Sequence, residues 1–135
     1  MTVGRLQQTR ARVERQPLVI IVAVAVAWLG LWAHELYRVP SALGLTLDGS
    51  LPLLTIALAL LIWWLRSADK RPAAWALLIY ALINAVGGML SVLPLPFLPF
   101  VPEQTVDHYL VHLLYAFCQG PLIGLALAVA IARRM

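Results

Sequence analysis

The sequence predicts an all-α integral membrane protein: a four-helix bundle of up-and-down topology with both termini in the cytoplasm. Three observations predict it: an apolar fraction of 62% with only 12% charged residues, four long apolar runs, and basic residues gathered between alternate runs. A typical soluble domain is about 45–50% apolar and about 25% charged. A chain of 135 residues forms one domain and cannot hide this much apolar surface from water, so we expect lipid to be its solvent.

The first expected helix covers residues 17–37 and follows a basic cytoplasmic segment at residues 1–16. A basic start before an apolar run also describes a secretory signal peptide. This run is about 20 residues long, however, against roughly 7–15 for the apolar part of a signal peptide, and no clear small-x-small pattern precedes His34. We therefore expect the segment to be retained as a membrane helix.

The other three runs differ in length. They are expected as helices at about 50–66, 72–93 and 108–132, before a cytoplasmic C-terminus at 133–135. The uninterrupted run 51–65 would span only about 22 Å at 1.5 Å per residue, against roughly 30 Å of hydrocarbon. We therefore expect this helix to recruit residues from the preceding segment 41–50. Pro72 suits the first turn of the next helix.

The basic residues predict the orientation. Nine of the ten Lys and Arg residues fall at the N-terminus, in the 66–71 connection or at the C-terminus, whereas the other two connections contain only Arg38. Positively charged connections stay in the cytoplasm, so we expect both termini and residues 66–71 to lie there. We expect the protein to lie in the plasma membrane, with the lipid bilayer as a partner. The basic residues form no face with interleaved aromatics, so nucleic acid is not expected as a partner.

The expected outer connection at 94–102 is dominated by proline. Four prolines in nine residues remove backbone donors and exclude a helix or a central strand. We expect an extended, polyproline-like stretch whose apolar side chains lie at the outer lipid interface or cap the bundle.

Residues spaced i, i+4, i+7 and i+11 share one face of a helix, and this spacing collects most small and polar residues of each run. The four faces are Ala23–Ala27–Gly30–His34, Asp48–Pro52–Thr55–Ala59, Tyr80–Asn84–Gly87–Ser91 and His108–His112–Tyr115–Gln119. Because hydrocarbon offers no hydrogen-bond partner, we expect these faces to turn inward. The first and fourth helices can be neighbours in such a bundle, so His34 and His112 are expected to meet.

The polar members of these faces lie toward the expected outer surface, with only Tyr80 below mid-membrane. They form a candidate outward-facing pocket that comprises His34, Asp48, Thr55, Asn84, Ser91, His108, His112, Tyr115 and Gln119. The three histidines are candidate metal ligands, supported by Glu35, Asp48 or Asp107, since imidazole binds zinc, copper, nickel and haem iron. The i, i+4 spacing of two of them is also found in metal-binding helices. In the alternative, structural interpretation, such side chains bond across helices for about 0.6 kcal/mol each and need no ligand.

No catalytic set is recognisable, and the single Cys118 excludes a CxxC redox site. We therefore expect a non-enzymatic accessory or interaction subunit, in a homo-oligomer or a larger membrane complex. One alternative is a binding protein whose outward pocket holds a metal, haem or small solute. A homodimeric small transporter is a further alternative, against which the apolar inner half argues.

Overall fold

The computed structural model describes residues 4–5, 7–9, 11 and 16–132. The regular structure of residues 16–132 is entirely helical, in agreement with the all-α prediction. The elements are α2 (Pro17–Arg38), a 3-10 turn η1 (Pro40–Ala42), α3 (Ser50–Arg66), α4 (Arg71–Ser91) and α5 (Val106–Ile131). Three of them, α2, α4 and α5, are long and apolar enough to cross a membrane, whereas α3 has 17 residues and is shorter.

The helix ends follow local sequence signals. Pro17 occupies the first turn of α2, where its missing N–H costs nothing. Thr105 caps α5, because its hydroxyl accepts a hydrogen bond from the backbone N–H of His108 at 3.4 Å. Lys70 and Arg71, at the start of α4, donate to carbonyls at the ends of α3 and α5: Lys70 Nζ to Trp64 O at 2.6 Å and Arg71 Nε to Ala130 O at 3.1 Å.

The α2–α3 connection corrects one prediction. The second helix takes only Ser50 from the 41–50 segment: α3 spans Ser50–Arg66, which agrees with the expected 50–66 but leaves the helix short. The chain instead leaves α2 through η1 and turns back at Leu43 and Gly44, both with positive φ. A side chain at Gly44 would approach the backbone N of Leu36 to 2.8 Å, so glycine suits both the turn and the close approach. The connection therefore lies against the end of α2 and cannot lengthen α3.

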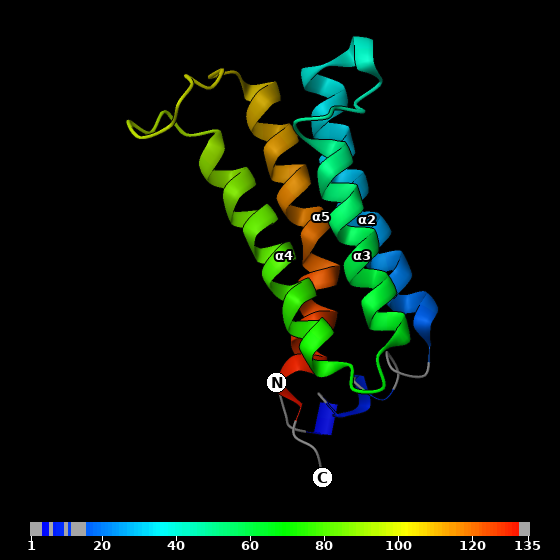
Figure 1. Cartoon of the computed structure of the whole chain (residues 1–135). Helices are drawn as coiled ribbons and strands as arrows, with labels where there is room; N and C mark the ends of the chain where they lie inside the picture. The colour runs from blue at the N-terminus through cyan, green and yellow to red at the C-terminus, as the bar shows by residue number, and fades with distance from the viewer. Residues whose placement is uncertain (1–3, 6, 10, 12–15, 133–135) are drawn as a thin grey trace.

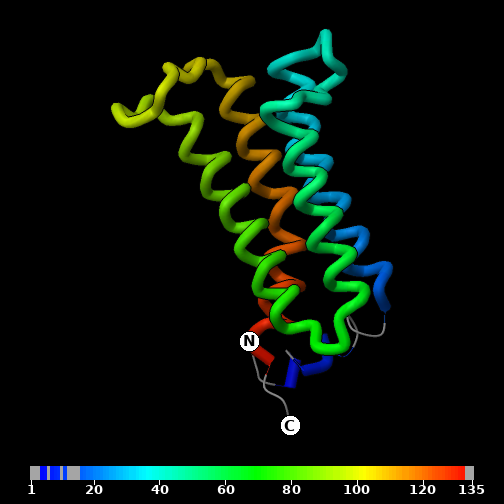
Figure 2. The backbone as a smooth tube through the Cα atoms, viewed as in Figure 1, coloured from blue at the N-terminus to red at the C-terminus, as the bar shows by residue number. Residues whose placement is uncertain are grey.

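The four long helices run side by side (Figures 1 and 2). Helix α5 packs most extensively, against α2 and α4, and α3 contacts the same two helices from the other side. One end of the molecule contains the start of α2, the α3–α4 connection and the end of α5; we call it the basic end. The opposite end contains the η1 and α4–α5 connections and is called the histidine end.

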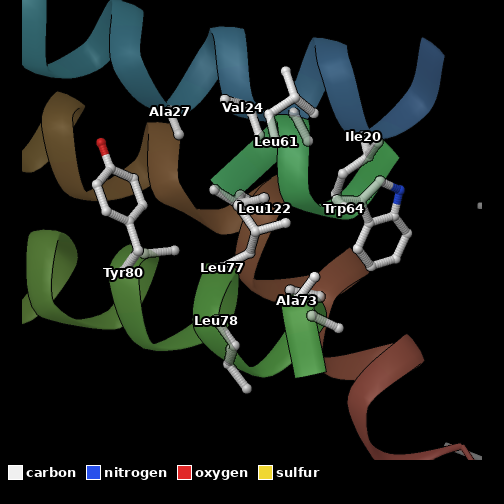
Figure 3. Close-up of a cluster of buried hydrophobic side chains, with 14 of the residues drawn as sticks. Ile20, Val24, Ala27, Leu61, Trp64, Ala73, Leu77, Leu78, Tyr80 and Leu122 are labelled. Atoms are coloured by element: carbon white, nitrogen blue, oxygen red, sulfur yellow. The ribbon is translucent and has the colours of Figure 1, made fainter. Parts of the chain in front are cut away.

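The apolar core occupies the half of the molecule toward the basic end. Its larger buried members include Val129. Figure 3 shows the others, which are Ile20, Val24, Leu61, Trp64, Leu77, Leu78, Tyr80 and Leu122. Alanines from every helix fill the spaces between them. Tyr80 belongs to this cluster, and its hydroxyl donates to the carbonyl of Leu53 at 3.1 Å. The expectation that Tyr80 turns inward is confirmed, since it is 8% exposed.

The α4–α5 connection differs from the predicted extended stretch. It bends repeatedly between residues 92 and 100, and Leu98 N donates to Leu95 O across one turn at 3.2 Å. Residues 94–95 and 101–105 have no turn or bend. The prolines correctly predicted that this connection forms neither helix nor strand. Proline also favours tight turns, however, and the predicted extended stretch did not take this into account.

Candidate cation site

Two histidines from different helices meet near the histidine end. Helix α2 positions His34 four residues before its last residue, and α5 positions His112 two turns after its start. Their Nε2 atoms lie 3.0 Å apart, and the ring centroids 4.4 Å apart. The prediction that His34 and His112 meet is confirmed, because α2 and α5 are packed neighbours.

The other ring nitrogen of each histidine is already in use. Nδ1 of His112 lies 2.5 Å from the carbonyl of Gly88, which can only accept, so this nitrogen carries the hydrogen. Nδ1 of His34 lies 3.2 Å from Oε1 of Glu35, a carboxylate paired with Arg38, so this nitrogen is also a donor. In the neutral imidazoles both Nε2 atoms are then acceptors. Two lone pairs facing each other at 3.0 Å repel unless a cation lies between them.

Glu35 organises this part of the site. It is 5% exposed, and its Oε2 accepts from Arg38 at 2.7 Å and from the hydroxyl of Thr46 at 2.8 Å. A buried carboxylate is costly unless it is paired and hydrogen-bonded, and these contacts meet that need. Glu35 therefore holds the ring of His34 in one orientation and one tautomer.

The η1 connection holds the other side of Glu35. Thr46 Oγ1 accepts from the N–H of Ser50 at 3.1 Å, and the hydroxyl of Ser50 donates to Gly44 O at 2.6 Å. Trp32 donates to Leu43 O at 2.9 Å and ties the same connection to α2. Thr46 and Ser50 therefore hold the connection beside Glu35, and Trp32 holds it against α2.

His108 lies beside the pair, nearer the surface. Its ring centroid is 4.6 Å from that of His112, 6.3 Å from that of His34 and 6.0 Å from that of Tyr37. In residues 16–132, no group of three or more His, Cys, Asp or Glu side chains is arranged to hold a metal ion. The three predicted ligands are thus close together, but only His34 and His112 direct nitrogens at one another.

The polar residues below the pair pack against each other. Tyr115 is stacked 6.0 Å from His34, and its hydroxyl donates to Oδ1 of Asn84. Gln119 donates to the carbonyl of Ala27 at 2.9 Å, while its buried Oε1 has no hydrogen-bond partner within the described residues. The predicted inward positions of Asn84, Tyr115 and Gln119 are confirmed, since all three are buried.

Three other predicted pocket residues are placed differently. Thr55 is exposed and donates to Leu51 O of its own helix at 3.0 Å, so the inward orientation predicted for its face is wrong. Helix α3 instead buries Ser50, Ala57, Leu61 and Trp64. Asp48 is exposed and lies 3.4 Å from Arg38. Ser91 is half-buried and donates to Gly88 O at 3.0 Å.

The reason for the error in α3 is chemical. Ser50, Ala57 and Trp64, each seven residues apart, lie on the buried face of α3. The prediction instead rested on the polar residues Asp48 and Thr55, although the inner face of this helix is mostly apolar. Residues that sequence reasoning missed as site members are Arg38, Thr46, Ser50 and Gly88. The i, i+3 spacing of Glu35 and Arg38 was the available signal for the first of them.

Comparisons of the chain with models of protein families, with curated proteins and with solved structures find no match.

Proposed function

We propose that the chain is a plasma-membrane protein with four spanning helices, α2 to α5, and that the basic end is cytoplasmic. Three helices meet the length requirement, and α3 runs alongside them between the same two ends. The 66–71 connection at the basic end contributes Arg66, Lys70 and Arg71, and basic connections remain on the cytoplasmic side. On this proposal the histidine end faces outward.

A labelling experiment tests the orientation. The single native thiol is removed with Cys118→Ser, and single cysteines are introduced by Ala68→Cys in the α3–α4 connection or Glu103→Cys in the α4–α5 connection. A thiol reagent that cannot cross membranes should label Glu103→Cys in intact cells and Ala68→Cys only after lysis. The reverse pattern would reject the orientation, and equal labelling of both would show that α4 does not cross the membrane between them.

The function that we propose for this protein is binding of a cation, a transition-metal ion, between His34 and His112. The single observation that carries it is the 3.0 Å contact between two Nε2 atoms whose Nδ1 partners make both of them acceptors. Metal-binding histidines use the same arrangement, in which the second nitrogen donates to a carboxylate or a backbone carbonyl. Here Glu35 and the carbonyl of Gly88 supply those two acceptors.

The nitrogen separation favours a small ion over haem. Nitrogens bonded to one ion at about 2.0–2.1 Å lie about 2.9–3.4 Å apart when the angle at the metal is between about 90° and 109°. The observed 3.0 Å falls in this range. Two imidazoles on opposite sides of a haem iron would be about 4 Å apart, with room for the macrocycle between them.

Calorimetric titration of the purified protein with Zn²⁺, and then with Cu²⁺, tests the proposal. We expect one ion per chain, bound about 100-fold or more weakly by His34→Ala and by His112→Ala. Thr55→Ala, an exposed residue of α3, is the control and should bind as the unchanged protein does. Failure of the unchanged protein to bind either ion would overturn the metal proposal. The 3.0 Å contact between the two Nε2 atoms would then be explained by a proton that they share.

A second candidate is the accessory or interaction subunit. An apolar groove of about 430 Å³ lies between α2 and α5 on the lipid-facing surface toward the basic end, lined in part by Leu18, Val22, Val26, Pro121 and Leu125. A groove between two spanning helices suits an apolar helix of a companion subunit or a second copy. Native mass spectrometry of gently extracted protein would show a companion at fixed stoichiometry, whereas a bare monomer would reject this candidate.

The transporter alternative is less well supported. A transported cation would have to pass the apolar cluster between Tyr80 and the basic end, in which Leu77 and Leu122 are 0% exposed. We therefore assign the site a binding role at the outer side, without passage to the cytoplasm.

A further inference from the structure

The α4–α5 connection contains eleven consecutive residues, 92–102, without a polar side chain. It consists of valine, leucine, phenylalanine and four prolines. In a water-soluble loop of this length, polar residues normally predominate, because the backbone and side chains face solvent. The composition instead resembles that of the helices, although no helix is formed there.

Val92 at the start of this segment is buried, but three of its large side chains are exposed. Val101 is 91% exposed, Phe97 74% and Phe100 52%. The segment projects sideways from the end of α4, away from α2 and α3, in Figures 1 and 2. Its residues also surround a hollow of about 340 Å³ lined by the 94–102 stretch alone. In water such an arrangement would expose apolar surface that folding against the helices could have buried.

The η1 connection shows the same property on the other side of the histidine end. Leu47 is 86% exposed and Leu43 68%. The two connections extend to opposite sides in Figure 1, with the first turns of α5 between them. Apolar side chains therefore flank the end of the molecule at which the histidine pair lies.

We propose that residues 92–102 bind the lipid bilayer itself, lying in the boundary between headgroups and acyl chains of the outer leaflet. The inference rests on the proposed spanning topology, which places this segment at the level where the helices leave the hydrocarbon. Lipid fits better than a protein partner, because the segment carries no charge or hydrogen-bonding side chain with which a protein would be recognised. Its four prolines also lower the number of backbone N–H groups that must be hydrated at this depth.

The proposed position of residues 92–102 also determines how cations would reach the cation site. With 92–102 and Leu47 seated in the same boundary, the His34–His112 pair lies just below the headgroups. Cations would then reach the pair from the headgroup layer past the half-buried ring of His108, which is nearer the surface.

Fluorescence in lipid nanodiscs of phosphatidylcholine tests the proposal. In the Cys118→Ser background, an environment-sensitive dye is attached to Val101→Cys, to Glu103→Cys as the neighbouring polar control, or to Ile83→Cys. Ile83 is 66% exposed in the middle of α4 and reports on the hydrocarbon. Quenching is measured with lipids that carry a spin label near the headgroup or deep in the acyl chain.

We expect the dye at Val101→Cys to emit at shorter wavelength than at Glu103→Cys and to be quenched at least twofold more by the shallow label. Water-like emission at Val101→Cys would overturn the proposal. Short-wavelength emission without lipid quenching would also overturn it and show that a protein surface covers the segment. Failure of the deep label to quench Ile83→Cys would instead contradict the spanning topology, so the two failures are distinguishable.

Discussion

At the residue scale, Glu35 has the widest set of contacts near the histidine pair. It joins the guanidinium of Arg38, the hydroxyl of Thr46 and Nδ1 of His34, which come from α2 and from the η1 connection. Of these contacts, the one to His34 decides which ring nitrogen carries a hydrogen. On the proposed function, Glu35 is a positioning residue: it would act on the proposed cation through the imidazole that it orients.

The variant Glu35→Gln tests this role. The amide oxygen would turn toward Arg38 and Thr46, leaving the NH₂ group to face Nδ1 of His34. This nitrogen would become the acceptor and Nε2 would carry the hydrogen, which removes one lone pair from the site. We expect Zn²⁺ affinity, measured by calorimetry, to fall about 10–100-fold.

Asp48→Asn is the matched control for this prediction. Asp48 also contacts Arg38, at 3.4 Å, but it is exposed and does not touch His34. Its removal should leave Zn²⁺ affinity within about twofold, since exposed ion pairs contribute little. Equal affinities of Glu35→Gln and the unchanged protein would show that Glu35 has only a structural role.

At the element scale, the packing of α4 on α5 depends on which of two adjacent glycines faces the partner helix. A Cβ at Gly88 would lie 2.7 Å from the ring carbons Cδ1 and Cε1 of Tyr115, whereas a Cβ at Gly87 would meet nothing within 4 Å. The carbonyl of Gly88 also accepts from His112. Small residues let helices approach closely in lipid. Gly88 lets α4 pack closely against Tyr115 of α5, and its carbonyl then reaches His112.

The pair Gly88→Ala and Gly87→Ala tests this packing. Tyr115 cannot move freely, because it is stacked on His34 and donates to Asn84. Gly88→Ala should therefore lower the free energy of unfolding by about 1–3 kcal/mol. Gly87→Ala should leave it unchanged or raise it by up to about 1 kcal/mol through helix propensity. Unfolding by SDS in mixed micelles provides the measurement, and similar values for both variants would contradict the geometry.

At the scale of the whole molecule, the two halves differ in what they contribute. The half toward the basic end is an apolar cluster with contributions from all four helices, and the half toward the histidine end contains the buried polar contacts. Interhelical polar contacts in membranes average only about 0.6 kcal/mol each. We therefore assign most of the packing stability to the apolar half.

Leu77→Ala tests this division. Leu77 is 0% exposed in the apolar cluster, so truncation leaves a cavity and should cost about 2–5 kcal/mol. Ile83→Ala, on the same helix but 66% exposed, should change the free energy of unfolding by less than about 1 kcal/mol, since lipid fills the space. A cost for Leu77→Ala no greater than that for Ile83→Ala would contradict the assignment. Zn²⁺ binding by the folded fraction of Leu77→Ala should be unchanged.

The sequence by itself determined the helical class, the positions of the helices and part of the polar cluster, namely His34, Asn84, His112, Tyr115 and Gln119. Helix α2 spans Pro17–Arg38 and α5 spans Val106–Ile131, within two residues of the expected 17–37 and 108–132. These features depend on local properties, namely length of apolar runs, proline position and periodicity, which each segment carries alone. The meeting of His34 and His112 followed because neighbouring helices place their inward faces together.

Only the tertiary structure decided which face of α3 is buried, which of Gly87 and Gly88 meets Tyr115, and how each histidine nitrogen is used. Thr55 and Ser50 are both small hydroxyl residues near the start of one helix, yet Ser50 is 0% exposed and Thr55 is exposed. A nearly uniform apolar helix can be rotated at little cost in lipid, so neighbouring helices and the η1 connection set its rotation. Likewise, the acceptor for Nδ1 of His34 is the adjacent residue Glu35, whereas the acceptor for Nδ1 of His112 is the carbonyl of Gly88 on another helix. Only the packing of the helices brings both acceptors to one site.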